Sequence, residues 1–129
     1  MADKNFYIKF YKDIIPEILV GKKTLEVRPR SLSFLKKAQN SEYAYLTYGP
    51  RFGAPTVFAK AKIEDVEVRP FESVTEDDLV QIGYDWSNRP REEFINEYTD
   101  WFSKELDKGY EPVWVHFNVT ESYDSDMER

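Results

Sequence analysis

The chain has 129 residues, enough for one domain with a sizeable buried core, and its formal net charge is −6. It contains no cysteine and a single histidine, which excludes disulfides, cysteine nucleophiles and thiolate zinc and leaves too few ligands for a histidine-based metal centre. No stretch approaches the roughly 18 apolar residues of a membrane span, and the first residues lack the apolar centre of a signal peptide. We therefore expect a soluble, cytoplasmic protein with neither a metal nor a cofactor.

Positive and negative charges are separated along the chain. Residues 1–63 contain 12 lysines and arginines against 5 acidic residues, whereas residues 64–129 contain 6 against 19. Electrostatic steering acts within about a Debye length, roughly 8 to 10 Å, so the basic half can attract phosphates although the total charge is negative. The alternative is that the acidic half is an ordinary solvated helix surface and the asymmetry has no function.

The N-terminal segment is predicted to contain a strand, a short helix and a second strand. Apolar and polar residues alternate over Phe6–Tyr11, which is typical of a strand. Residues 14–19 carry an apolar stripe at helical spacing, with Asp13 as a plausible N-cap and Gly21 fitting the left-handed position after the helix. A second strand then covers residues 24–28.

This second strand has two chemically different faces. Because side chains alternate along a strand, Leu25 and Val27 share one face and Thr24, Glu26 and Arg28 share the other. The first face is expected in a core. The second carries a hydroxyl, a carboxylate and a guanidinium on a rigid element, with lysines just before it and another arginine just after it. Such a charged cluster is the place in this sequence where a binding site is expected.

The middle of the chain is predicted as a basic connector over residues 30–40, with at most one helical turn, and an aromatic-rich strand at Tyr43–Tyr48. Two glycines and two prolines make residues 49–55 a loop. There Arg51 beside Phe52 offers a cation and an aromatic face for phosphate contact and base stacking. The alternative is a plain hairpin connection with a buried phenylalanine.

The C-terminal half is predicted as a strand at residues 56–68, helices at 73–82 and 90–108, a last strand at 112–120 and an acidic, disordered tail at 121–129. The first helix is indicated by a Ser-x-x-Glu capping-box pattern, and the second by a proline at its first position and an aromatic stripe. This order of elements predicts one α+β domain over residues 1–120.

The segment from Gly21 to Arg28 matches the pattern G-x-K-x-x-E-x-R, with Gly21, Lys23, Glu26 and Arg28 at the fixed positions. It resembles the signature of the ASCH domain family, and the resemblance covers about residues 5 to 119. It implies a small PUA-like β-barrel of five to six strands with two to three helices outside it. It also implies an RNA- or nucleotide-binding role for a basic cleft beside the second strand.

The binding hypothesis places single-stranded RNA, a nucleotide or a nucleoside in this cleft. Arg28 would bind a phosphate or a base because its planar guanidinium binds oxyanions in a bidentate manner, and Glu26 would orient Arg28 or accept a hydrogen bond from a base amino group. The expected ligand-binding residues are Lys23, Glu26, Arg28, Arg30, Tyr48, Arg51 and Phe52.

The resemblance also implies an alternative, because some family members hydrolyse acylated cytidine nucleosides and others cleave RNA. In such a hydrolase or ribonuclease Lys23 would be the central catalytic residue, since a desolvated amine near other cations can lose its proton near neutral pH. The hydrolase pattern pairs this lysine with a threonine, at the place of Glu26 here, and with a glutamate near residues 81–83, and neither is present. Thr24 and Asp85 are the substitutes that this sequence offers.

Other polar and aromatic side chains have simpler explanations. His116 falls in a strand of alternating apolar residues and is expected to be a packed residue with one hydrogen bond rather than a general base. Tyr45, Tyr48, Trp86 and Trp114 are possible platforms for base stacking, but each is expected in the core or as an ordinary surface residue. A third hypothesis is a protein-interaction domain that uses the acidic helices. The sequence leaves the oligomeric state open.

Overall fold

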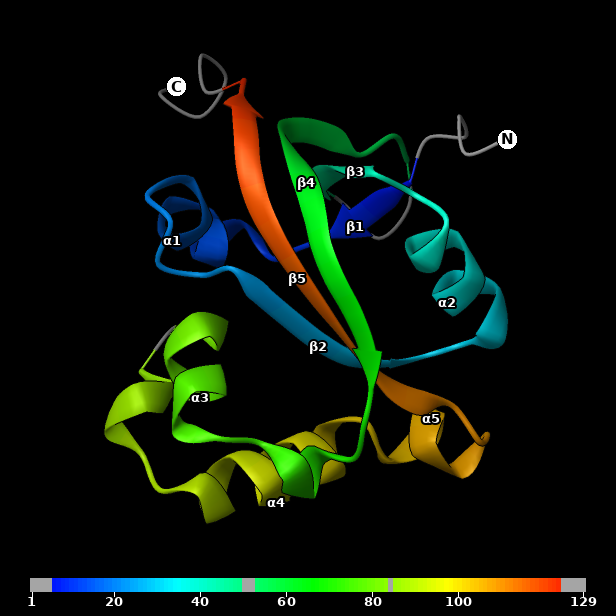
Figure 1. Cartoon of the computed structure of the whole chain (residues 1–129), viewed down its shortest axis with the longest axis vertical. Helices are drawn as coiled ribbons and strands as arrows, with labels where there is room; N and C mark the ends of the chain where they lie inside the picture. Colours follow the sequence, from blue (N-terminus) through cyan, green and yellow to red (C-terminus); the bar gives the residue numbers. More distant parts are fainter. Residues whose placement is uncertain (1–5, 50–52, 84, 124–129) are drawn as a thin grey trace.

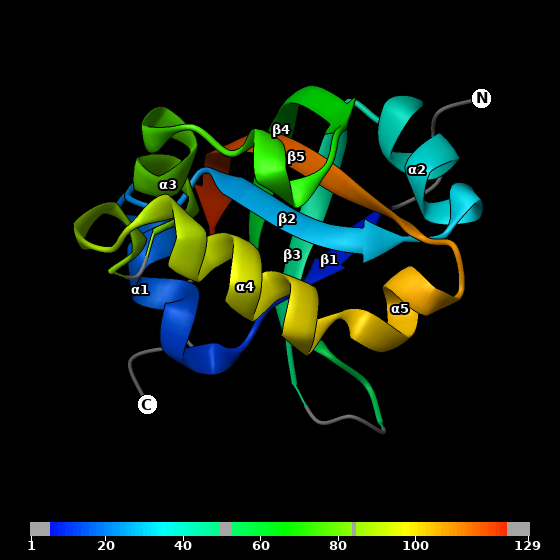
Figure 2. The same cartoon turned by 90° about the horizontal axis from the view of Figure 1, so that it is seen from below.

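The computed structural model describes residues 6–49, 53–83 and 85–123. Its centre is one five-stranded sheet in the order β1-β3-β4-β5-β2, curled into a half-barrel (Figures 1 and 2). β1 and β3 run parallel, and the other neighbouring strands run antiparallel. The strands are β1 (Tyr7–Lys9), β2 (Leu25–Arg30), β3 (Tyr43–Tyr48), β4 (Thr56–Val68) and β5 (Glu111–Ser122).

Helices surround the sheet, and the α+β class and barrel-like fold predicted from the sequence are confirmed. α1 and α2 lie on opposite sides of the half-barrel, while α3 and α4 lie together next to β2 (Figures 1 and 2). No helix in the described residues is long and apolar enough to cross a membrane. The α-helices are α1 (Ile15–Leu19), α2 (Leu32–Gln39), α3 (Glu76–Ile82), α4 (Arg91–Trp101) and α5 (Ser103–Asp107), and the 3-10 helices are η1 (Lys12–Ile14), η2 (Phe71–Ser73) and η3 (Trp86–Asn88).

Two hydrophobic cores lie on opposite faces of the sheet. The first is on what we call the inner face, where Leu46 of β3 and Val115 of β5 pack with apolar residues of α1 and α2. The second is on the outer face at β2, where Leu25, Val27 and Trp114 pack under α3 and α4. The prediction that Leu25 and Val27 are buried is therefore confirmed, and their core is the one beneath the helices rather than the interior of the half-barrel.

The helices differ most from the sequence-based prediction. The basic connector contains a two-turn helix, α2, whose N-cap Ser31 accepts a hydrogen bond from the backbone N–H of Phe34. The predicted helix at 90–108 is interrupted at Phe102, whose φ of −109° and ψ of 24° are not helical. The capping box exists, but it joins Thr75 to Asp78 rather than beginning at Ser73, which lies in η2.

Three smaller boundaries also differ. Regular pairing in β1 covers only Tyr7–Lys9, and Asp13 lies inside η1 instead of capping a helix. At the other end, β5 runs to Ser122, two residues beyond the predicted Thr120, because Lys60 and Ala59 of β4 continue the pairing. Residues 124–129, the rest of the predicted tail, lie outside the described part of the chain.

Adjacent residues of α3 provide a test of the second core. Leu79 is 3% exposed and Val80 is 58% exposed. Replacing Leu79 with Ala should lower the free energy of unfolding by about 2 to 5 kcal/mol, because it leaves a cavity in the core. The matched change Val80→Ala should stay within about 0.5 kcal/mol. Urea titrations would measure both, and equal effects would contradict the packing of α3 described above.

Candidate functional site

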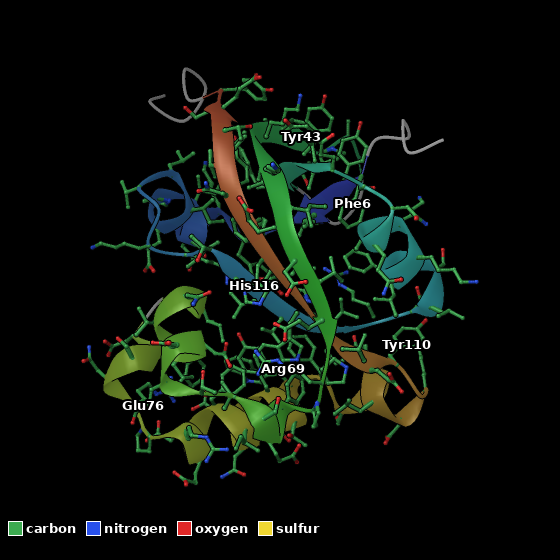
Figure 3. All side chains as sticks on the ribbon, in the orientation of Figure 1. Phe6, Tyr43, Arg69, Glu76, Tyr110 and His116 are labelled. Atoms are coloured by element: carbon green, nitrogen blue, oxygen red, sulfur yellow. The ribbon has the colours of Figure 1, made fainter. Side chains whose placement is uncertain are left out.

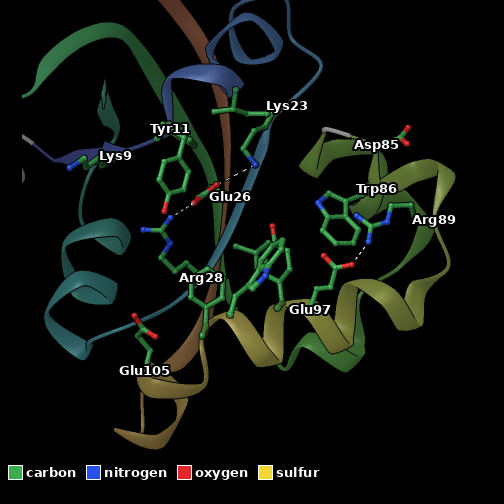
Figure 4. A pocket seen from close by; sticks show the side chains of 16 residues that line it. Lys9, Tyr11, Lys23, Glu26, Arg28, Asp85, Trp86, Arg89, Glu97 and Glu105 are labelled. Carbon is green, nitrogen blue, oxygen red and sulfur yellow. Dashed lines mark hydrogen bonds and ion pairs between the residues drawn. The ribbon is translucent and has the colours of Figure 1, made fainter. Parts of the chain in front are cut away.

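A pocket of about 880 Å³ lies along β2, which is an edge strand of the sheet. Its walls come from residues 9–14, from the segment that begins at Lys23 and continues into β2, and from residues 85–105. In Figure 4, Lys23, Glu26 and Arg28 line one side, and Trp86 and Glu97 lie opposite them. The volume falls within the range of roughly 300 to 1,000 Å³ that is common for small-molecule sites.

Lys23 is the most constrained charged residue of this pocket. It is 4% exposed, and its Nζ donates to the backbone carbonyls of Leu25 at 2.8 Å and Ile82 at 2.9 Å. The Oε1 atom of Glu26 lies 3.2 Å from the same nitrogen. An ammonium has three N–H donors, so these three acceptors use all of them. The arrangement joins the start of β2 to the end of α3.

The pKa of Lys23 reflects two opposing effects. Burial lowers it from 10.5, and the charge of Arg28 adds a small lowering, whereas Glu26 and Glu17 raise it. Burial is the largest of these effects because an ammonium loses most of its hydration in such a site. The three acceptors around Nζ, in turn, favour the protonated form.

Gly83 allows α3 to approach Lys23 this closely. Its φ is +89°, a conformation that side chains strongly disfavour. A Cβ atom on Gly83 would also lie 2.8 Å from Oε1 of Glu17 and 3.1 Å from Cβ of Lys23. The contact between α3 and the segment before β2 thus favours glycine at the residue that ends α3.

Glu26 and Arg28 lie on the inner-face side of β2. They are paired with Val115 and Val113 of β5, and residues opposite one another in an antiparallel pair point to the same face. Arg28 Nη2 lies 3.9 Å from Glu26 Oε2, and the guanidinium lies 5.5 Å from the centre of the Phe102 ring. Among the described residues, the buried Nε of Arg28 has no hydrogen-bond partner.

The opposite wall is aromatic. Trp86 is 4% exposed, and its ring makes edge contacts with Trp101 and Tyr98. Trp101 is 58% exposed, so a large part of its ring faces solvent at the pocket. Arg89 lies 4.1 Å from the centre of the Trp86 ring and forms ion pairs with Glu93 and Glu97 of α4. Its charge is therefore already balanced within this wall.

The pocket as a whole has no excess of positive charge. Among the described residues, its lining contains four basic and four acidic side chains. The basic residues are Lys9, Lys23, Arg28 and Arg89, and the acidic residues are Glu26, Asp85, Glu97 and Glu105. Lys23 is bound to Glu26 and Arg89 to the acidic residues of α4, whereas the Nε of Arg28 has no hydrogen-bond partner among the described residues.

Neither of the two predicted substitutes for the hydrolase partners is among the described partners of the Lys23 ammonium. Thr24 is held by its backbone, which donates to the carbonyl of Gln81 and accepts from the N–H of Phe117, and it does not line the pocket. Asp85 does line the pocket, but it is exposed and its Oδ1 accepts from Asn88. In Figure 4 its carboxylate points away from Lys23.

The other predicted ligand-binding residues lie outside the pocket or outside the described residues. Arg30 stacks on Phe34 of α2, 4.2 Å from the ring centre, and burial together with the charge of Arg28 lowers its pKa to about 10, against an opposing effect of Glu26. Tyr48 is near Lys12 and the ring of Phe58, away from the pocket. Arg51 and Phe52 belong to residues 50–52, which the structure does not describe.

The sequence analysis missed most of the opposite wall. Trp86 was considered for stacking, and either Trp101 or Phe102 was expected in the helix stripe that packs on the sheet. Phe102 takes that place, and Trp101 is exposed. The sequence did contain a sign that Trp101 is exposed, because α4 has more aromatic residues than one buried stripe needs. Tyr11, 75% exposed, also lines the pocket, and in Figure 4 its ring points toward Arg28.

One group of described residues, separate from the pocket, has the side chains to hold a metal ion. The candidate ligand atoms of Asp65, Glu67 and His116 lie within 4.8 Å of one another. His116 Nε2 is 2.6 Å from Glu67 Oε2, and Arg69 Nε is 3.4 Å from the other oxygen of Glu67. The arginine already balances this carboxylate, so the group fits an ion-pair network in which His116 has the single polar contact expected for a packed residue.

The fold and the pocket define an α+β half-barrel with a small-molecule-sized site at a sheet edge. No protein-family model matches the sequence, and no curated protein matches it. Solved structures do match. An Enterococcus faecalis V583 protein described by the family-model DUF984 has a TM-score of 0.66 at 18% identity, over 100% of this chain and 83% of that protein.

Two further structures are similar over most of the chain. A Pyrococcus furiosus protein has a TM-score of 0.58 at 17% identity, covering 90% of this chain and 97% of its own. The ASCH domain from Lactobacillus crispatus JV V101 has a TM-score of 0.56 at 18% identity, covering 90% of this chain and 80% of its own. The ASCH resemblance noted in the sequence is therefore confirmed at the level of the fold.

The buried position of Lys23 makes the stability of the fold depend on pH. A lysine whose pKa is lowered by folding binds fewer protons in the folded state, so its contribution to stability increases as the pH rises toward 10.5 and is lost as the pH falls through the folded pKa. Lys23→Met should lower the free energy of unfolding by roughly 3 to 5 kcal/mol, since it leaves Glu26 without its closest partner.

The difference between the wild type and Lys23→Met should widen from about pH 7 to about pH 10. Lys22→Met is the matched control, because Lys22 is an exposed neighbour. Urea titrations at the two pH values would measure both differences. A difference that stays constant or narrows for Lys23→Met would show that folding does not lower the pKa of Lys23.

Proposed function

We propose that the pocket beside β2 binds a nucleoside or a mononucleotide. The observation that carries this proposal is Arg28, whose guanidinium lies at the pocket with a buried, unpartnered Nε and only a 3.9 Å ion pair to Glu26. The ion pair to Glu26 is long, so the guanidinium can also donate to a ligand oxyanion or carbonyl, which guanidinium groups bind strongly. The side chain is 28% exposed, so it can be reached.

The surroundings of Arg28 support a nucleobase as the rest of the ligand. Trp101 offers an exposed ring, and every base has a π-face that can stack on it. Glu26 is fixed by Lys23 and stays a hydrogen-bond acceptor, which suits the exocyclic amino group of cytosine or adenine. An aromatic wall with a few fixed polar groups is typical of small-molecule sites.

A single-stranded RNA along this pocket is less well supported. Its lining has as many acidic as basic side chains among the described residues, and Lys23 and Arg89 are already paired. A polymer site needs several phosphate contacts from unpaired cations. The charge balance therefore favours a ligand with one phosphate or none.

A hydrolase or ribonuclease centred on Lys23 is the second candidate. It is favoured by the position of Lys23, which lines the pocket and has a pKa lowered by burial. The three acceptors around Nζ argue against catalysis by Lys23. A neutral amine has only two N–H donors, so one of the three acceptors would lose its hydrogen bond. We infer that the first role of Lys23 is to position Glu26.

The binding proposal predicts a specific effect of Arg28. The probes are cytidine, adenosine and their 5′-monophosphates, titrated by isothermal calorimetry. Arg28→Ala should weaken monophosphate binding about tenfold or more, the usual effect of losing a hydrogen bond to a charged group. Arg30→Ala is the matched control, since Arg30 is two positions along the same strand but stacks on Phe34 outside the pocket. Equal affinities for wild type and Arg28→Ala would overturn the proposal.

The catalytic alternative is tested with N4-acetylcytidine and with a short RNA, using mass spectrometry to detect products. If Lys23 is catalytic, product forms with the wild type and disappears with Lys23→Ala, while Lys22→Ala stays active. We expect no product with the wild type, because Nζ is saturated with acceptors. Product that requires Lys23 would show that the amine leaves its three partners during turnover.

A further inference from the structure

A second surface, distinct from the pocket, carries tyrosines and lysines on the outer side of β1, β3 and β4. We call it the tyrosine–lysine face. Strand register places its members together, because Tyr7 is opposite Tyr45, Tyr45 is opposite Lys60, and Tyr43 is opposite Lys62. Tyr123, just after β5, donates from its backbone N–H to Phe58 of β4 and lies at the border of the same face. The face consists of Tyr7, Tyr43, Tyr45, Lys60, Lys62 and Tyr123.

These side chains contact one another but leave much of their surface open. The Tyr7 and Tyr45 ring centres are 5.7 Å apart, and Lys60 Nζ lies 4.5 Å from the centre of the Tyr43 ring. Tyr7 is 49% exposed, and Tyr43 and Tyr123 are each 38% exposed. Large aromatic surface that stays exposed in a cluster is unusual for a monomer and marks an interaction site.

The helices do not cover this face. α1 and α2 pack in the inner-face core with residues such as Ala44 and Ala61, which alternate along the same strands with members of the tyrosine–lysine face. α3 and α4 pack in the second core, at β2 and β5. Figure 3 shows Tyr43 at the end of the sheet away from Glu76 and α3.

We propose that the tyrosine–lysine face binds single-stranded nucleic acid. Exposed tyrosine rings on a sheet can stack on unpaired bases, which is sequence-tolerant because each base has a π-face. Lys60 and Lys62 stand beside those rings and supply charge complementary to phosphates. Among the described residues, Glu121 is the acidic side chain opposite Lys60, and it accepts from the hydroxyl of Tyr123.

This site differs from the pocket in the ligand it suits. None of the six residues of the face lines the pocket, whose basic and acidic side chains are balanced. A duplex would hide its bases from tyrosine rings, so the face should prefer a single strand. The proposal does not depend on what the pocket binds.

The test is fluorescence anisotropy with a labelled oligouridylate of about 12 nucleotides, titrated at several salt concentrations. Lys60→Ala/Lys62→Ala should weaken binding and reduce the salt slope by about 1.4, since each phosphate contact on a single strand contributes about 0.7. Tyr43→Ala should weaken binding about fivefold or more, as expected for loss of one stacked base, with the salt slope unchanged.

Three controls make the test specific. Lys36→Ala/Lys37→Ala removes the same charge from exposed positions of α2, which packs on the inner-face core, and should leave both affinity and slope nearly unchanged. Arg28→Ala tests whether the oligonucleotide occupies the pocket instead. A duplex of the same length should bind more weakly than the single strand. Melting temperatures of all variants would show that each is folded.

The proposal fails if the oligonucleotide does not bind, if the two lysine pairs have equal effects, or if only Arg28→Ala weakens binding. The last result would place the polymer in the pocket. Mononucleotide calorimetry on the face variants separates the two proposals, because those variants should bind mononucleotides as the wild type does. The proposal for the pocket and the proposal for the tyrosine–lysine face can thus be refuted independently of each other.

Discussion

The buried ammonium of Lys23 is the interaction on which the site depends. It binds the carbonyl of Leu25, at the start of β2, and the carbonyl of Ile82, at the end of α3, which is 59 residues from Lys23 in the sequence. Because burying a charge is costly unless it is fully paired, this contact tolerates little movement of either segment. Gly83 makes the approach possible, since any Cβ there would collide with Glu17 and Lys23.

The electrostatics of the pocket follow from this contact. Lys23 takes the nearer oxygen of Glu26, at 3.2 Å, and leaves Arg28 with a 3.9 Å interaction to the other oxygen. Lys23 therefore positions the carboxylate of Glu26, and Arg28 keeps N–H donors for a ligand. β2 can present these groups because it is an edge strand whose apolar side chains are buried on the opposite face. An exposed edge strand can pair with another chain and is usually covered, and here the edge strand β2 forms the floor of the pocket.

Sequence reasoning was most successful where local patterns determine structure. The alternation of Leu25 and Val27 with Glu26 and Arg28 predicted both faces of β2, since strand period alone fixes them. Sequence reasoning was weaker at helix boundaries such as Phe102, where tertiary packing decides at which residue a helix ends. It could not find the wall formed by Trp86 and Trp101, because tertiary packing of η3 and α4 brings these two rings to the pocket beside β2. It likewise could not foresee that Arg30 would stack on Phe34, in a helix that is longer than the single turn expected there.

The most direct test of the account is an NMR titration of the tryptophan indole N–H signals with cytidine 5′-monophosphate. The account predicts a saturable shift of the Trp101 signal, because its exposed ring lines the pocket. The Trp114 signal should stay in place, since its ring is fully buried and its indole N–H donates to the carbonyl of Arg69. Three unchanged indole signals at saturating ligand, or a shift of Trp114 without Trp101, would contradict a nucleotide site beside β2.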